Sequence, residues 1–242
     1  MALAIPSVLL AGVVGYAATS PALTSNASLL NGAPCTVTLS GASYSGTCSG
    51  AFVQPTATPS PTPTFTIAQS NQQLFTMAAS FTPSLPGASH AGSSLVLLVS
   101  AAGDGNSSFG LPAGWLRVAD VTDGNPVGLH LFYYPNAPAG TSFGAFTQAP
   151  AANLAYTIAE VGATLSLDRT GTATTGATAV GSLTASLSGA TSAPAEVIFA
   201  GFGASQGATP QSWNAPTGFS LVNEQDTNTV SEAILSAQVV NA

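Results

Sequence analysis

The sequence predicts an all-β protein: an antiparallel, jelly-roll-like β-sandwich, preceded by an apolar N-terminal arm and a small hairpin closed by a disulfide. Three observations lead to this prediction. From about residue 67 onward, short runs rich in β-branched and aromatic residues alternate with Gly, Pro, Asn and Asp, as in sandwiches. No stretch has a long helical period. Finally, PAGWLRV at 112–118 is echoed by PTGFSLV at 216–222.

Residues 1–30 are predicted to form the apolar arm. The opening segment MALAIPSVLLAGVVGYAATSPA has the apolar run of a signal peptide but lacks the positive region that precedes such a run. Pro6, Gly12 and Gly15 interrupt it, which disfavours a helix that crosses a membrane. We therefore expect a retained arm, and the alternative is a retained membrane or pilin-like helix.

Residues 31–53 contain CTVTLSGASYSGTC, which predicts a hairpin around the turn Ser-Gly-Ala-Ser. The predicted pairs are Thr36 with Thr47, Val37 with Gly46 and Leu39 with Tyr44. This register places Cys35 opposite Cys48, so we expect a disulfide worth about 3 kcal/mol in the chain-entropy model. It would indicate an oxidising environment. The alternative is a pair of reduced thiols.

Residues 54–66, QPTATPSPTPTFT, are predicted to be a linker. Pro55, Pro59, Pro61 and Pro63 favour an extended, polyproline-like chain. The expected organisation is an anchoring arm and hairpin at 1–53, the linker at 54–66 and a β-sandwich domain at 67–242. Its strands are predicted at 73–81, 94–101, 115–121, 127–134, 142–148, 154–161, 180–187, 196–203, 219–225 and 232–240.

The repeated motif predicts two similar halves within one sandwich. Its residues are Pro112, Gly114, Trp115 and Val118 in the first copy and Pro216, Gly218, Phe219 and Val222 in the second. The glycines permit the backbone angles of a turn, and the aromatic residues would fill equivalent places in the core. Two tandem domains are the weaker alternative, because each would have too few strands to bury both faces.

Several segments resemble a β-sandwich module, jelly-roll or immunoglobulin-like, that recurs in phage virion proteins, as decoration or tail-associated subunits, and in bacterial surface proteins. They cover about residues 73–240 and are SLVLLVSA, PAGWLRVAD, GLHLFYYPNAPAGTSF, LAYTIAEVGA, LDRTGTAT and GFSLVNEQ. The resemblance implies a display or adhesion module and supplies no catalytic residues.

The scarcity of charge excludes some functions and favours others. Only 5% of the residues are Asp, Glu, Lys or Arg, against roughly 25% in an ordinary domain. Two arginines and a formal charge of −7 cannot supply the cations that nucleic-acid binding needs. No Asp, Glu, Lys or Arg occurs before Asp104. We expect neighbouring subunits to cover much of this uncharged part; the alternative is a surface hydrated by Ser, Thr, Asn and Gln.

A catalytic site is not expected. A hydrolytic triad needs a base, and the two candidates are His90 and His130. We expect His90 in a loop and His130 on a strand face toward solvent or a partner. Neither has a G-x-S-x-G motif beside it. The acidic pairs Asp120 with Asp123 and Glu160 with Asp168 are interpreted as surface-solvating residues rather than glycosidase carboxylates. We also expect Arg117 to pair with Asp120 or with another acid, and Asp168 with Arg169 to form a local charge pair or a turn.

Two ligand hypotheses remain from the sequence. The loops Asp104–Asn106 and Asp123–Asn125 both read DGN and could supply oxygen ligands to Ca²⁺, although Asp-Gly equally favours a turn. Tyr133 and Tyr134, with nearby Phe143 and Phe146, could form a glycan-binding platform, although core packing explains alternate members of the run. We expect no other cofactor or metal.

The sequence therefore predicts a structural, non-enzymatic subunit of an assembled particle. The expected protein is a phage virion accessory protein, a capsid decoration or tail-associated subunit, whose partners are other copies and a capsid, tail or fibre scaffold. One alternative is a secreted bacterial or archaeal adhesin or pilus-type filament subunit located at the cell surface. A second is a carbohydrate-binding module that contacts host-surface glycans.

Overall fold

The computed structural model describes residues 7–15, 36–40, 43–47, 65–102, 108–122, 127–172, 174–176, 186–187, 195–204, 215, 217–225 and 233–241. This part of the chain is all-β, with antiparallel strands joined by turns and loops and with no helix. The chain divides into two compact units. One comprises residues 19–62, and the other combines residues 1–18 with residues 63–242.

The smaller unit contains a hairpin of β2 (Thr36–Ser40) and β3 (Ser43–Thr47). Its pairing confirms the predicted register, with Thr36 opposite Thr47 and Ser40 opposite Ser43 at the turn. Alternating Thr, Val and Leu side chains and a Ser-Gly-Ala-Ser turn are enough to set such a register locally. Cys35 and Cys48 lie outside the described residues, so the disulfide remains a prediction.

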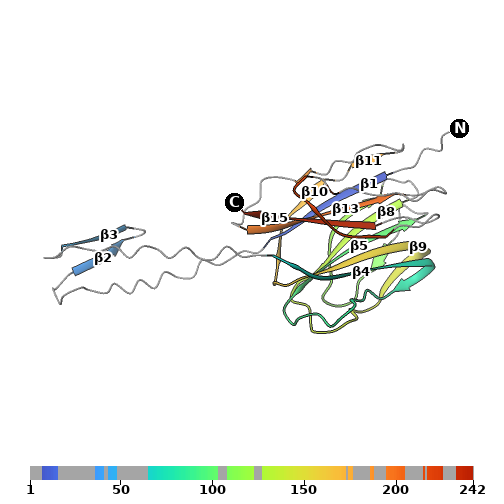
Figure 1. The fold of residues 1–242 in the computed structure, drawn as a ribbon, viewed down its shortest axis with the longest axis horizontal. Helices are drawn as coiled ribbons and strands as arrows, with labels where there is room; N and C mark the ends of the chain where they lie inside the picture. Colours follow the sequence, from blue (N-terminus) through green and yellow to red (C-terminus); the bar gives the residue numbers. More distant parts are fainter. Residues whose placement is uncertain are drawn as a thin grey trace. The chain divides into compact units, whose positions relative to one another are not determined.

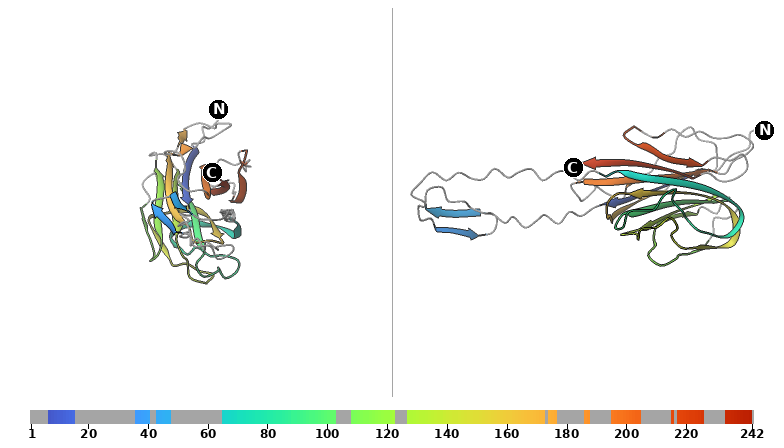
Figure 2. Two further views of the ribbon diagram at one scale, coloured as in Figure 1. Left: turned by 90° about the vertical axis from the view of Figure 1, so that its left-hand side faces the viewer. Right: turned by 60° about the horizontal axis from the view of Figure 1, so that its bottom comes forward.

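The first sheet of the larger unit has six strands, and Figure 2 shows its two longest, β4 and β9, as a curved pair. The strands are β4 (Ile67–Phe81), β5 (Ser94–Ala102), β6 (Ser108–Gly110), β7 (Leu116–Thr122), β8 (Val127–Tyr134) and β9 (Phe146–Val161). Their order is β4-β9-β5-β8-β7, and β6 pairs with β9. All of β5 except its last residue is buried, as a continuous apolar run predicts.

The second sheet has seven strands, and Figure 1 shows β1 among the strands of the C-terminal half. The strands are β1 (Ser7–Gly15), β10 (Ser166–Thr172), β11 (Thr174–Gly176), β12 (Ser186–Leu187), β13 (Ala195–Ala204), β14 (Ser220–Gln225) and β15 (Ala233–Asn241). Their order is β12-β10-β1-β13-β15-β14, and β11 pairs with β1. The predicted similarity of two halves is seen in the strand order, β4-β9-β5-β8-β7 in the first sheet and β10-β1-β13-β15-β14 in the second, except that β1 comes from the N-terminal part of the chain.

The place of β1 differs from the predicted arm. Ser7–Gly15 lies inside a sheet, antiparallel to β13 along its whole length and to β10 on its other side. The physical reason is that an uncharged run such as SVLLAGVVG suits a strand buried on both faces as well as it suits an arm. The predicted unit 1–53 is therefore divided, because residues 1–18 belong with the larger unit.

Strand boundaries differ from the predictions around Pro150 and after residue 165. The predicted strands 142–148 and 154–161 are one strand, β9, whose pairing with β4 jumps from Ala152 to Thr147. Pro150 falls within this irregular part, where its missing N–H costs no regular ladder bond. Strand β10 was not predicted, because the polar run SLDRTGT has no clear alternation. Of the strand predicted at 180–187, only 186–187 is described, as β12.

Consecutive strands stay within one sheet, from β4 to β9 and, apart from β1, from β10 to β15. The jelly-roll-like connection, in which consecutive strands alternate between two sheets, is therefore not the one observed. Strand pairing shows the difference, since β7 and β14 each pair directly with the next strand along the chain, β8 and β15.

A shared core joins the two sheets. Val197 and Phe199 of β13 belong to the same buried cluster as Val96 and Leu98 of β5. The approach is close, because a Cβ added to Gly201 of β13 would lie 2.4 Å from Cδ1 of Leu98. A second, aromatic-rich cluster lies on the other face of the six-stranded sheet, where strand ends and loops cover it.

The two copies of the repeated motif have the same local structure. Gly114 and Gly218 have positive φ angles of 90° and 88°, which only glycine adopts readily. A strand begins two residues later in each copy, at Leu116 and at Ser220. Pairing with the next strand then shifts register at Val118 and at Val222.

The remaining motif residues differ in burial. Trp115 is buried in the aromatic cluster, whereas Phe219 is only partly buried, so the expected equivalence of the two aromatic side chains holds only in part. Pro112 is partly buried, and Pro216 lies outside the described residues.

Candidate functional site

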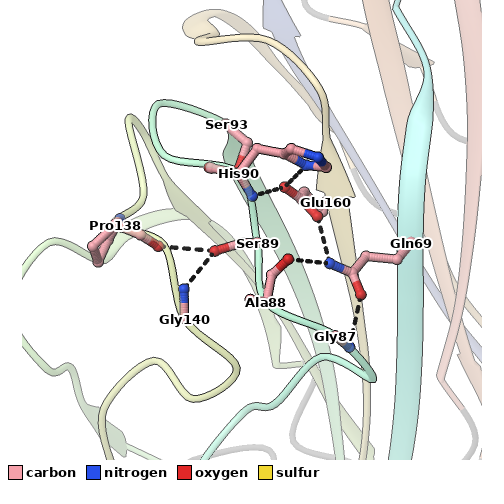
Figure 3. Close-up of polar contacts among 9 residues, drawn as sticks. All are labelled: Gln69, Gly87, Ala88, Ser89, His90, Ser93, Pro138, Gly140 and Glu160. Carbon is pink, nitrogen blue, oxygen red and sulfur yellow. Dashed lines mark hydrogen bonds and ion pairs between the residues drawn. The ribbon is translucent and has the colours of Figure 1, made fainter.

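A hydrogen-bonded polar cluster surrounds Glu160, a side chain with no exposed surface (Figure 3). Its Oε1 accepts a hydrogen bond from the His90 backbone N–H at 2.7 Å and lies 3.1 Å from His90 Nδ1. Its Oε2 accepts a hydrogen bond of 2.7 Å from Gln69 Nε2. The carboxylate on β9 thus joins β4 to the loop that precedes β5.

Hydrogen bonding determines the charge state of this carboxyl. Burial opposes ionisation, but hydrogen bonds from Gln69, from the His90 backbone and from Ser93 outweigh it. The pKa of Glu160 therefore lies below its ordinary value of 4.5. The cluster holds an ionised carboxylate.

The cluster continues into a second loop. The Ser89 hydroxyl donates to the Pro138 carbonyl at 2.8 Å and accepts from the Gly140 N–H at 3.2 Å (Figure 3). Gln69 Oε1 also accepts from the Gly87 N–H at 3.0 Å. These bonds tie two loops, around residues 86–93 and 135–143, to each other and to the sheet. Their role is to position loops.

The prediction that Glu160 is a surface-solvating residue is wrong. The carboxylate has no exposed surface, whereas a glycosidase acid paired with Asp168 would have to face the substrate. One signal could have revealed its burial: LAYTIAEV is nearly continuous in apolar residues, and a lone charge in such a strand is paired inside the protein. No comparable signal pointed to Gln69.

Replacing Glu160 with Gln is expected to destabilise the protein in a pH-dependent way. Because the pKa of Glu160 is lowered on folding, its ionised form contributes fully above pH 4.5, and this contribution is lost as the pH falls through the folded-state value. The variant should therefore be about 1–3 kcal/mol less stable than wild type near neutral pH, and this difference in stability should become smaller in acid. Urea denaturation of both proteins across pH measures the difference.

The control for this experiment is His90→Ala, which keeps the backbone N–H that bonds Glu160. It should cost less than Glu160→Gln, because the His90 side chain is 79% exposed. A stability gap between wild type and Glu160→Gln that stays constant from neutral to acid pH would contradict an ionised carboxylate.

A second polar cluster joins Asp120 and His130. His130 Nδ1 lies 2.8 Å from Asp120 Oδ1, and Arg117 donates to Oδ2 of the same carboxylate. Burial of Asp120 opposes ionisation, but the bonds with His130 and Arg117 outweigh it and lower the pKa of Asp120 below its ordinary value of 3.8. The predicted pairs Arg117 with Asp120 and Arg169 with Asp168 are both confirmed, the second at 3.8 Å.

The expected exposure of His130 is wrong, because its imidazole is buried beside Phe109 and Phe132. An acid and an imidazole in contact are two parts of a hydrolytic triad. The free atom, Nε2, is buried, however, and has no hydrogen-bond partner among the described residues. It therefore meets no nucleophile in this part of the chain, and the pair acts to fix β7 on β8.

The predicted glycan contact does not hold for Tyr133. Its side chain is buried between the sheets and its hydroxyl donates to the Leu165 carbonyl. Burial raises the pKa of this hydroxyl above its ordinary value of 10, although a hydrogen bond with Ser94 opposes the change. Tyr134 is half-buried against Trp115. Phe143 and Phe146 are buried as well, so these residues form core, not a platform.

The two predicted Ca²⁺ loops, at 104–106 and at 123–125, lie outside the described residues. Among the residues that the structure describes, no three His, Cys, Asp or Glu side chains gather where they could hold a metal ion. The same part of the chain contains no helix that is long and apolar enough to cross a membrane.

The fold and these clusters define the class of protein: in the part of the chain that the structure describes, an all-β protein whose larger unit has two antiparallel sheets and whose buried charged groups hold strands and loops in place. Comparison with known protein families, characterised proteins and solved structures gives no match. Function must therefore be inferred from the chain itself.

Proposed function

We propose that the chain is a structural, non-enzymatic subunit of an assembled particle, in the first place a phage virion accessory protein such as a capsid decoration or tail-associated subunit. The observation that carries this proposal is the lack of Asp, Glu, Lys and Arg before Asp104. A free monomer normally relies on scattered surface charge for its solubility. The phage virion assignment rests on the sequence resemblance described above.

The edge strand β4 supports contact with other copies. It forms one edge of the six-stranded sheet and has no charged residue along its length. Edge strands of soluble proteins usually carry charges that prevent edge-to-edge pairing. At Ser70 this edge is covered by β14, because the Asn223 amide donates a hydrogen bond to the Ser70 hydroxyl. Further along the edge, Met77 is 65% exposed. Such a surface suits burial against another subunit.

The proposed organisation assigns different roles to the two units. The two sheets, with their shared core, would form a β-sandwich that is displayed on the particle. Residues 19–53, closed by a Cys35–Cys48 disulfide and followed by the Pro-rich linker at 54–66, would attach to the capsid, tail or fibre scaffold. Attachment through residues 1–30 as a free arm is withdrawn, since removing them would remove the internal strand β1.

The position of β1 favours the alternative of a secreted adhesin or pilus-type filament subunit. An apolar N-terminal segment that is itself a sheet strand can polymerise subunits by strand addition. This alternative shares the structural, self-assembling character of the first proposal and differs in location, at a cell surface instead of a virion.

Light scattering and electron microscopy of the full chain test the proposal. We expect particles or filaments of many copies, and we expect them to persist at about 1 M salt, because screening weakens only contacts between charges. A chain that remains monomeric at every concentration would overturn the proposal. Dissociation by salt alone would contradict an uncharged contact surface.

A further inference from the structure

The two sheets share one strand order, and β1 occupies the place in the second sheet that β9 occupies in the first. The first sheet runs β4-β9-β5-β8-β7, and the corresponding part of the second runs β10-β1-β13-β15-β14. The motif that precedes β7 also precedes β14. The correspondence therefore matches β4 with β10, β5 with β13, β7 with β14, β8 with β15 and β9 with β1.

The hydrogen-bonded pairings agree with this correspondence. Strand β9 runs antiparallel to both β5 and β4, and β1 runs antiparallel to both β13 and β10. In the first half, β9 follows β8 along the chain. In the second half, the corresponding place is filled by Ser7–Gly15. The second half is thus completed by β1, and no hairpin connects β1 to its neighbours in this sheet.

We propose that β1 is a donor strand exchanged between copies of this chain, so that Ser7–Gly15 of one copy lies between β13 and β10 of a second copy. This inference rests on the proposed function and names the contact by which copies assemble. The partner is a second copy, because the place that β1 fills has the strand order and pairing of the chain's own repeat.

Strand exchange is favoured by connectivity. Residues 19–62, which follow β1, belong to the other compact unit, so no short turn holds β1 to the sheet it completes. The pairing of β1 with β13 and β10 is the same whether the strand comes from its own chain or from another, which is the usual basis of domain swapping.

The place that β1 fills must be occupied by some strand. Without β1, β13 and β10 would each expose a row of unpaired backbone groups in the middle of the sheet. The sequence SVLLAGVVG carries no charge and has the continuous apolar character of an internal strand. A free chain would therefore insert β1 into its own sheet or into the sheet of another copy. If each copy donates β1 to the next, the assembly grows without limit.

Disulfide trapping between two different variants tests the inference. Ala11 of β1 pairs with Ala200 of β13, so one variant carries Ala11→Cys and the other Ala200→Cys, both with Cys35→Ser and Cys48→Ser. The two variants are unfolded, mixed, refolded and oxidised. We expect a disulfide between the two chains, seen by non-reducing electrophoresis and located by mass spectrometry.

Two controls make the result specific. Ser7→Cys replaces Ala11→Cys as the out-of-register partner, because Ser7 pairs with Ala204, about 13 Å further along the strand, and it should give at most a trace of linked chains. A single chain with both Ala11→Cys and Ala200→Cys shows that the pair can form a disulfide, within or between chains.

The outcomes separate this inference from the proposed function. Disulfide only within the double variant, with no link between mixed chains although particles are present, would overturn strand exchange and leave assembly to other contacts. A monomer that forms only the internal disulfide would overturn both. Linked chains with Ala11→Cys but not with Ser7→Cys support both.

Discussion

Replacing Trp115 with Ala is expected to lower the free energy of unfolding by about 3–5 kcal/mol, the cost of truncating a large core side chain. Trp115 is only 5% exposed and packs edge-on against Phe146 and Tyr134. Its Nε1 also donates a hydrogen bond of 2.8 Å to the Phe143 carbonyl, which the variant leaves without that donor. Chemical denaturation of the full chain, followed by circular dichroism, measures the loss.

The neighbouring residue provides the matched control. Leu116 is 52% exposed, so Leu116→Ala should change the stability by no more than about 0.5 kcal/mol. Equal effects of the two substitutions, or a Trp115→Ala variant as stable as wild type, would show that the loops around Trp115 do not form a packed core.

The second large effect is expected for Gly114→Ala, at about 2–5 kcal/mol. An L-residue at a φ of 90° is strained, at roughly 1–2 kcal/mol. The new Cβ would also lie 2.3 Å from Cζ of Tyr134, so the ring would have to move, and overpacking of this kind typically costs about 1–3 kcal/mol. The same denaturation experiment measures the sum of the two costs.

Gly140→Ala is the control for this substitution. The nearest atom to its added Cβ would be the Ser142 carbonyl oxygen at 4.0 Å, and Gly140 does not have a positive φ. We expect a change within about 0.5 kcal/mol. If Gly114→Ala lowers the free energy of unfolding as little as Gly140→Ala does, the turn at Gly114 has another conformation. That result would contradict the turn geometry that the two copies of the motif share.

Local features were predictable from the sequence. The hairpin of β2 and β3 has the predicted register because its alternation and turn residues lie within a few positions of each other. The positive φ angles of Gly114 and Gly218 follow from the same kind of local signal, a glycine in a Pro-x-Gly-aromatic turn. Short-range sterics and hydrogen bonding decide such features, and both can be assessed from a short window of sequence.

The polar clusters were not predictable in the same way. Glu160 and His130 were expected at a surface, yet both are buried. Alternation along a strand indicates two faces but not whether loops cover the second one. Here the loop containing His90 covers Glu160, and Phe109 covers His130. These contacts join residues that are far apart in sequence, and no local pattern specifies them.

By itself, the sequence determined the all-β character of the described residues, the hairpin register, the duplicated turn and the uncharged character of everything before Asp104. Only the tertiary structure decided where the first strand belongs, which face of each strand is covered and which carboxylates are enclosed. The physical reason is that strand propensity and turn geometry are local, whereas sheet order depends on which distant strand satisfies an open row of backbone groups. The segment SVLLAGVVG could pair with any open strand edge of this kind. Only the fold shows that it pairs with β10 and β13.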